Sequence, residues 1–201
     1  DDDRVTTLRD RGFPFVVHGR TEGEVDYAYY DIDNDAAIAS ATTLLADLGH
    51  RRMALMNGPA GLAFVAQRET AFRRVLGERQ INVPERFISH DEMSEEQGFA
   101  RAASLLGGRE GPAPTAFICS STLQALGVIR AATAAGLQVG SDISIIAHDD
   151  VLPHLRSEHF SPPLTVTRSP IREAGAALAE MMVQRIDGVE PRQLQRIVTA
   201  D

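Results

Sequence analysis

The sequence predicts an α/β fold in which parallel strands alternate with helices. Short apolar runs with strand character recur along the 201 residues, and segments with apolar residues at three- and four-residue spacing lie between them. This alternation is typical of repeated β-α units and a largely parallel sheet. With 43% hydrophobic and 24% charged residues, the chain can bury the core of one large domain or of two smaller lobes.

The expected strands are short and end beside polar residues. In chain order they are Phe15–His18, Tyr27–Ile32, Met53–Asn57, Arg86–Ser89, Thr115–Cys119, Ile143–His148 and Leu164–Thr167. In an open α/β sheet, small ligands bind beyond the carboxyl ends of the strands. Asp149 and Asp150 directly follow a buried strand, so two adjacent carboxylates are expected at such a strand end.

Three helices are predicted by apolar residues three and four positions apart. Asn34 is the expected N-cap of the first, which stops at Gly49. Ser169 caps the last, and Pro170 occupies its first helical position. The apolar positions are Ile38, Ala41, Leu45 and Leu48, then Leu123, Leu126 and Ile129, then Ile171, Ala174, Leu178, Met181 and Ile186.

Two segments predict that the chain crosses between two lobes. Asp31–Asp35 is polar and passes directly from a strand into a helix, whereas Pro162–Pro163 blocks a helix and forces an extended crossing. A cleft lined by strand ends and first helical turns is then expected between the lobes. The expected N-terminal lobe contains residues 1–31 and 167–190, and the expected C-terminal lobe contains residues 32–166 and 191–201.

The charge and the apolar pattern exclude several classes of function. A net charge of −8 argues against this stretch clamping a polyanion, because binding to a phosphate backbone needs a concentrated basic face. Cys119, the single cysteine, lies in an apolar run and is expected to be a buried thiol. We find no apolar run of about 18 residues and no signal peptide, so no part of this sequence is expected to span a membrane.

The usual signatures of an enzyme are missing from the sequence. Histidines 18, 50, 90, 148, 154 and 159 do not show the spacing of a metal site, and Pro153 separates His148 from His154. There is no Gly-x-Ser-x-Gly motif for a nucleophilic serine, and Pro59 occupies a place in the Gly58–Gly61 turn where a phosphate loop needs backbone donors. We therefore expect neither catalysis, nor a metal, nor a cofactor.

A set of short motifs runs in order across almost the whole chain. They are Arg11–Arg20, Asp31–Asn34, Leu48–Leu55, Arg68, Pro114–Phe117, Ala125–Gly127, Asp142–Ile145, Asp149–Asp150 and Pro162–Thr165. Together they resemble the effector-binding core of LacI/GalR-type bacterial transcriptional regulators. The resemblance implies a two-lobed, periplasmic-binding-protein-like fold. It also implies that the helix-turn-helix headpiece and the first β-α units precede this stretch, so that the N-terminal lobe is incomplete here.

The resemblance places the effector contacts on separate segments. An arginine donates in a fixed fork and a carboxylate accepts from adjacent hydroxyls, so the set suits a sugar or a sugar derivative. Arg68 and Asp149 are the two contacts we consider strongest. The full set is His18, Tyr30, Arg68, Met93, Ser121 and Asp149.

Each of these residues also has a structural alternative. Arg68 could be a solvated helix residue paired with an acid, and Asp149 with Asp150 could form a turn that caps a helix. His18 could be a loop histidine, and Tyr30 a half-buried strand aromatic. The sequence has Ser120–Thr122 where many relatives place Asn-Asp, and His18 where a polar sugar contact is common, so the identity of the ligand does not carry over.

The resemblance also implies partners. A regulator binds operator DNA through its headpiece and dimerises to present two headpieces, and Leu126 and Arg130 occupy places that form the dimer face in the family. The alternative is a periplasmic sugar-binding protein of a transporter, which has the same two-lobed fold and is monomeric. The segments Leu48–Arg52 and Pro162–Thr165 favour the regulator.

Overall fold

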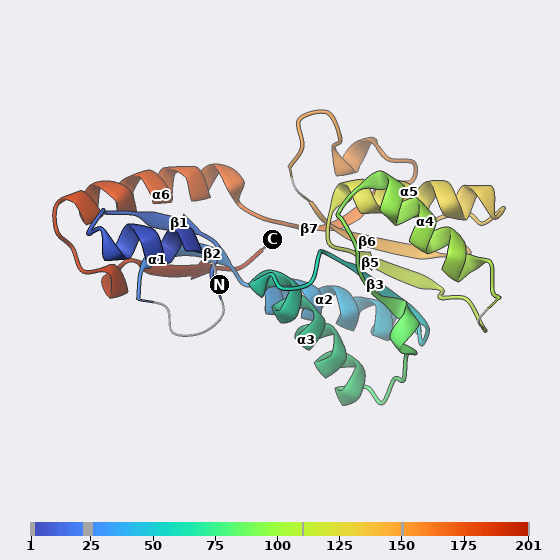
Figure 1. The fold of residues 1–201 in the computed structure, drawn as a ribbon. Helices are drawn as coiled ribbons and strands as arrows, with labels where there is room; N and C mark the ends of the chain where they lie inside the picture. Colours follow the sequence, from blue (N-terminus) through green and yellow to red (C-terminus); the bar gives the residue numbers. More distant parts are fainter. Residues whose placement is uncertain (1–2, 22–25, 110, 150, 201) are drawn as a thin grey trace. The chain divides into compact units, whose positions relative to one another are not determined.

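The computed structural model describes residues 3–21, 26–109, 111–149 and 151–200, which form two compact units (Figure 1). The first unit contains residues 1–33 and 170–201, and the second contains residues 34–169. Both have parallel strands and flanking helices, so the predicted α/β fold class is confirmed. The chain passes between the units twice, once after Asp33 and once after Ser169.

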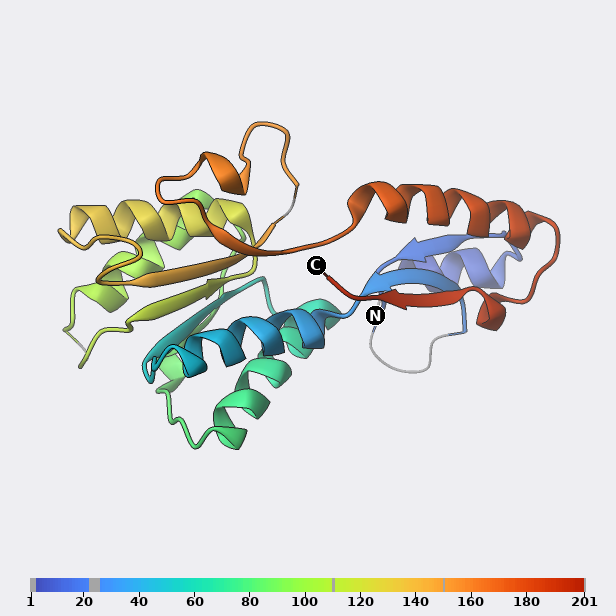
Figure 2. The ribbon, with the colours of Figure 1, turned by 180° about the vertical axis from the view of Figure 1, so that it is seen from behind.

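The first unit is built on a three-stranded parallel sheet with the order β1-β2-β8. Helix α6 lies along one face of this sheet (Figure 2), where Ala174, Ala177 and Met181 pack against Ala28 and Tyr30. Helix α1 buries none of its residues. The elements are α1 (Asp3–Asp10), β1 (Val16–His18), β2 (Ala28–Ile32), α6 (Ile171–Ile186), a 3₁₀ turn η3 (Pro191–Gln193) and β8 (Gln195–Val198).

The expectation that residues 191–201 belong to the second lobe is wrong. Strand β8 pairs in parallel with β2, and the register sets Tyr29 opposite Gln195 and Asp31 opposite Ile197. Ladder hydrogen bonds therefore hold this segment in the first unit. Its sequence shows little sign of a strand, because none of the four residues of β8 is fully buried and Arg196 interrupts the apolar pattern.

The second unit has a five-stranded parallel sheet with the order β4-β3-β5-β6-β7. Its strands are β3 (Met53–Asn57), β4 (Ile88–His90), β5 (Ala116–Cys119), β6 (Ser144–Asp149) and β7 (Thr165–Arg168). Its helices are α2 (Asn34–Asp47), α3 (Ala63–Glu78), α4 (Glu95–Leu106) and α5 (Thr122–Ala134), with 3₁₀ turns η1 (Glu85–Phe87) and η2 (Ser157–His159).

Both faces of this sheet are covered by helices, as the continuous apolar runs of its strands require. Successive strand residues point to opposite faces. Helices α2 and α3 form the layer on one face, and α4 and α5 form the layer on the other (Figure 1). Met53 and Leu55 pack with the first layer, whereas Ala54 and Met56 pack with the second. Strands β3 and β5 are buried along their whole length and form the centre of the unit.

Helices α4 and α5 cross with their backbones in contact, which glycine makes possible. A Cβ atom on Gly127 would lie 2.2 Å from the carbonyl oxygen of Glu95, and one on Gly98 would lie 2.4 Å from the carbonyl oxygen of Gln124. These distances are shorter than any van der Waals contact. Glycine at these two positions therefore allows the close approach of the helices. This approach also determines where the segments that lead into the two helices lie.

A buried histidine holds the residues at which the chain leaves the second unit. The side chain of His148, on β6, is 6% exposed. Its Nδ1 lies 3.0 Å from Thr167 Oγ1, and its Nε2 lies 2.8 Å from Ser169 Oγ. These hydroxyls come from β7 and from the last residue before the crossing, so His148 has a structural role here.

A second histidine connects strand beginnings at the opposite, amino end of the sheet. The ring of His50 lies between Thr115 Oγ1, 2.9 Å from its Nδ1, and Ser144 Oγ, 3.0 Å from its Nε2. Partial burial lowers the pKa of His50 below its ordinary value, so the neutral ring is favoured in this place.

We expect Gly127→Ala to lower the free energy of unfolding by about 3 kcal/mol, because the added methyl group overlaps backbone atoms that cannot move independently. The matched control is Gly77→Ala on α3, where a Cβ meets no atom within 4 Å; it should stabilise the chain by about 0.5–1 kcal/mol. Chemical denaturation measures both. Equal effects of the two substitutions would contradict the close crossing.

Candidate functional site

Buried polar side chains gather at the carboxyl ends of β3 and β5 in the second unit. Asn57 ends β3, while Ser120, Ser121 and Thr122 follow β5; none of the four is more than 3% exposed. Burying a polar group costs free energy unless the group is hydrogen-bonded, so a buried polar cluster indicates a structural or functional role. Its place, beyond the strand ends of a parallel sheet, is where α/β proteins bind small ligands.

Arg68 reaches into this cluster from α3. Its side chain is only 5% exposed, so the alternative of a solvated helix residue is wrong. Nε donates to Asn34 Oδ1 at 2.9 Å, and Nη1 donates to the carbonyl oxygen of Ser120 at 3.1 Å. The guanidinium thus connects the first residue of α2 with the turn that follows β5.

An aromatic ring that the sequence analysis did not single out lies beside Arg68. The guanidinium carbon of Arg68 is 4.8 Å from the centroid of the Phe64 ring, one helical turn earlier. Phe64 is partly exposed, and its Cζ and the Sδ of Met93 would both lie 3.3 Å from a Cβ on Gly58. The i, i+4 spacing of Phe64 and Arg68 was the available signal, because residues so spaced share a helix face.

Ser121 is close to this group, but its hydroxyl has a structural task. It is 3% exposed and accepts a hydrogen bond from the Gln124 backbone N–H at 3.1 Å, which makes it the N-cap of α5. Its Oγ also lies 3.5 Å from the Met93 carbonyl oxygen. Arg68, Met93 and Ser121 are therefore brought together in the second unit, with Phe64 as an unforeseen member.

The remaining predicted contacts lie on β6 and in the first unit. Asp149 is the last residue of β6 and pairs with Arg168 in the ladder, but its side chain and the whole of Asp150 lie outside the described residues. His18 is exposed at the end of β1. Tyr30 is 3% exposed and packs against α6, which supports its structural alternative.

The two residues expected at a dimer face lie on α5. Leu126 is partly exposed. Arg130 is exposed, forms an ion pair with Glu95 of α4 and lies 5.4 Å from the centroid of the Phe99 ring. Arg130 thus already joins α4 to α5 within the chain, whereas Leu126 offers an apolar surface.

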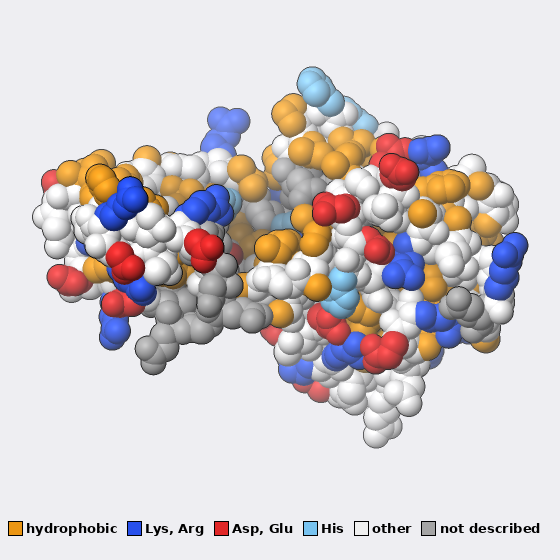
Figure 3. All heavy atoms as spheres, viewed as in Figure 1, with side chains coloured by type: hydrophobic (Ala, Val, Ile, Leu, Met, Phe, Trp, Pro, Cys, Tyr) orange, Lys and Arg blue, Asp and Glu red, His pale blue; other side chains and the backbone are white. Residues whose placement is uncertain are grey.

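The surface charge of the second unit is mixed. Three arginines of α3 and its C-terminal end pair with acids: Arg73 with Glu69 and Glu85, Arg74 with Asp35 and Glu78, and Arg79 with Asp47. Figure 3 shows acidic and basic side chains interspersed over this unit. Such a pattern differs from the concentrated basic face of a nucleic-acid-binding surface.

Other chemistry finds little support in the part of the chain that the structure describes. It contains no group of three or more His, Cys, Asp or Glu residues that could hold a metal ion, and no helix there is long and apolar enough to cross a membrane. Burial raises the pKa of the Cys119 thiol, so this cysteine is held in its unreactive protonated form.

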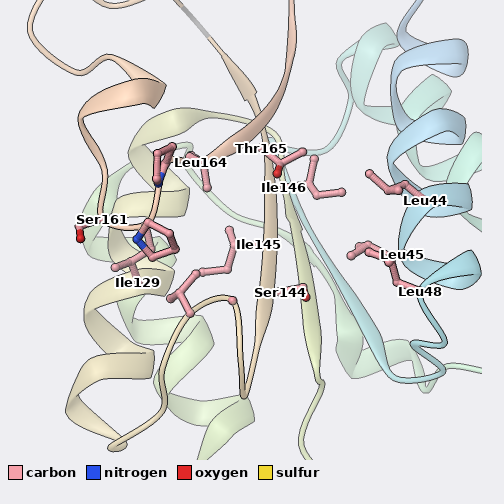
Figure 4. A pocket seen from close by; sticks show the side chains of 14 residues that line it. Leu44, Leu45, Leu48, Ile129, Ser144, Ile145, Ile146, Ser161, Leu164 and Thr165 are labelled. Carbon is pink, nitrogen blue, oxygen red and sulfur yellow. The ribbon is translucent and has the colours of Figure 1, made fainter.

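A small hollow, whose lining does not include Arg68, lies at the amino end of β6 (Figure 4). Its volume is about 130 Å³. Its walls are mostly aliphatic and carry no charged side chain: Leu44, Leu45, Leu48, Ile129, Val139, Gly140, Ser144, Ile145, Ile146, Ser161, Pro162, Pro163, Leu164 and Thr165. Its polar side chains are the hydroxyls of Ser144, Ser161 and Thr165, without the charged or amide groups that usually fix a polyhydroxylated ligand.

Comparison with known proteins agrees with this architecture. Residues 42–200 match the family described as periplasmic binding protein-like domain. The HTH-type transcriptional regulator AglR of Rhizobium meliloti (strain 1021) is 46% identical over 184 residues, which are 91% of this chain and 51% of the relative. The chain thus spans about half the length of this regulator.

Two solved structures are similar over the whole chain. The crystal structure of a regulatory protein of LacI family from Chloroflexus aggregans has a TM-score of 0.92 and 31% identity, and the match covers 100% of this chain and 70% of that one. A transcriptional regulator CelR–cellobiose complex has a TM-score of 0.89 and 29% identity, with 100% and 61% coverage.

The fold, the buried polar cluster and these matches together define a ligand-binding domain. The predicted resemblance to LacI/GalR-type regulators is confirmed. The chain belongs to the periplasmic binding protein-like domain family, in the form that LacI-family regulators carry as their ligand-binding core.

We expect Arg68→Met to lower the free energy of unfolding by about 2 kcal/mol, because it removes a buried donor from Asn34 Oδ1 and from the Ser120 carbonyl. Arg74→Met, on the exposed side of the same helix, should leave the free energy of unfolding nearly unchanged. Thermal and urea unfolding test both variants. If Arg74→Met lowers the free energy of unfolding as much as Arg68→Met, the hydrogen bonds of Arg68 to Asn34 and Ser120 do not have the proposed stabilising role.

Proposed function

We propose that this chain is the effector-binding core of a transcriptional regulator and that its effector is a sugar or a sugar derivative. The observation that supports this most is the group of Phe64, Arg68 and Met93 at the carboxyl ends of a parallel sheet. Its aromatic and aliphatic surface suits the apolar face of a sugar ring, and the polar cluster beside it offers hydrogen bonds to hydroxyl groups.

The relatives support this choice of ligand and of protein class. The CelR structure that this chain resembles is a complex with cellobiose, and AglR is named as a helix-turn-helix regulator. These matches favour a regulator over the sugar-binding protein of a transporter. We propose binding rather than catalysis, a cytoplasmic location, and binding to operator DNA through a headpiece outside this stretch.

The effector would act by coupling. A ligand shifts a conformational equilibrium only by the difference between its affinities for the two states, and coupling energies of this kind are typically about 1–3 kcal/mol. Asp149 and His18 remain proposed effector contacts. Asp149 in particular supplies the acceptor that a pair of sugar hydroxyls requires.

The first experiment is a thermal-shift screen of the chain against neutral mono- and disaccharides including cellobiose, sugar acids, acyclic polyols and nucleobases. A ligand that binds only the folded state raises the apparent melting temperature. A selective rise with neutral sugars supports the proposal. A rise only with sugar acids would narrow the effector to that kind of sugar derivative, a rise only with nucleobases would replace the ligand class, and no rise with any compound would argue against a sugar effector.

We expect Phe64→Leu to weaken the binding of the sugar found in this screen about tenfold, since it keeps apolar volume but loses the ring face. Phe64→Tyr should stay within about threefold of the unchanged chain. Leu62→Ala, an exposed apolar residue just before α3, is the control and should have no effect. Isothermal titration measures the three affinities, and unchanged binding in Phe64→Leu would remove Phe64 from the site.

We further propose that the chain dimerises through the exposed face of α5. Leu126→Glu should yield a monomer, because a charge at the centre of an apolar interface is costly to desolvate. Thr70→Glu adds the same charge to an exposed position on α3 and should leave the dimer intact. Light scattering gives the mass of each variant, with circular dichroism as the test of folding. A dimer that persists in Leu126→Glu places the interface elsewhere.

A further inference from the structure

Asn57 is fully buried at the carboxyl end of β3. Its side-chain amide and its backbone carbonyl form four hydrogen bonds to other residues. Its Nδ2 donates to the Val65 carbonyl at 2.9 Å. Its Oδ1 accepts from the Gly58 backbone N–H and from Ser120 Oγ, both at 3.0 Å. Its own carbonyl accepts from Gln124 Nε2 at 3.0 Å.

These partners belong to the two segments that form the candidate site. Gly58 and Val65 bracket the segment from β3 into α3, which carries Phe64. Ser120 begins the turn into α5, and its carbonyl is an acceptor for Arg68. The side-chain amide of Asn57 thus connects the segment that carries Phe64 with the turn whose carbonyl accepts from Arg68.

The chemistry requires an amide at this position. Two acceptor bonds and one donor bond meet on a single short side chain, and among side chains of this size only asparagine offers both functions in the right number. An aspartate would set a carboxylate oxygen against the Val65 carbonyl, where the amide now donates. A buried, uncompensated acceptor pair of this kind is repulsive.

We propose that Asn57 is the positioning residue of the effector site and that its amide fixes the segment carrying Phe64 relative to the turn that anchors Arg68. It does not touch the ligand itself, because it is completely covered. The consequence for ligand affinity rests on the proposed function, whereas the consequence for the two segments can be measured without any ligand.

The first test is amide hydrogen exchange on the ligand-free chain carrying Asn57→Asp. We expect exchange of the amides at residues 58–65 to accelerate at least about tenfold beyond what the loss of global stability explains. The control is Val128→Ala, which opens a cavity in the core beneath α5 and lowers stability without touching Asn57. Equal local exchange in the two variants, after correction for global stability, overturns the proposal.

A second readout separates positioning from mere packing. Protonation of the carboxyl introduced by Asn57→Asp restores a donor toward the Val65 carbonyl, so protection of residues 58–65 should recover as the pH falls through the pKa of this carboxyl, which burial raises. The elements around Asn57 carry other charged or titratable groups, so the unchanged chain is measured over the same pH range as the reference. These groups are Arg68, Glu69, Arg73, Arg74 and Glu78 of α3, His90 of β4, Cys119 of β5 and Arg130 of α5. No recovery at low pH contradicts the donor role.

The ligand arm uses cellobiose and any other neutral sugar that stabilises the unchanged chain. We expect Asn57→Asp to weaken the affinity about tenfold at pH 7 and the deficit to shrink at lower pH. Full affinity in this variant overturns the positioning role at the site. If no sugar binds the unchanged chain, the proposed function fails, while the exchange experiment still decides whether Asn57 fixes the two segments.

Discussion

The buried guanidinium of Arg68 is the constraint around which the second unit is organised. A charge that is 5% exposed must be surrounded by acceptors, and the acceptors have to come from other segments because a helix satisfies its own carbonyls. Asn34, at the start of α2, and the carbonyl of Ser120, after β5, meet this need. Strand order makes this possible: β3 and β5 are neighbours, so the segments that follow them emerge side by side.

The polar cluster would not keep its shape without the apolar layers on either side. The contact between α4 and α5 at Gly98 and Gly127 leaves no room for adjustment. Ser121, which lies in the candidate site, is also the N-cap of α5. The position of α5 therefore determines where this side of the site lies. Helix α5 thus links the packing on one face of the sheet to the polar cluster at the carboxyl ends of its strands.

The α/β class, the second unit and most of its strands could be predicted, because apolar runs buried on both faces leave a strong signal in the sequence. Strand β8 could not, since its pairing with β2 joins residues far apart in the chain and its side chains are partly exposed. Arg68 was identified only through resemblance: an arginine in a helix says nothing of its burial. Asn57 left no signal at all, because its importance lies in partners that only folding brings together.

Both points at which the chain enters and leaves the second unit are held by buried polar side chains. Asn34, the first residue of the unit, accepts from Arg68, and Ser169, the last, lies against His148. A displacement of the Arg68 guanidinium would therefore act directly on Asn34, the residue at which the chain enters the second unit. If the proposed effector contacts Arg68, a difference of about 1–3 kcal/mol between the two states of this hydrogen bond would match the usual size of a coupling free energy.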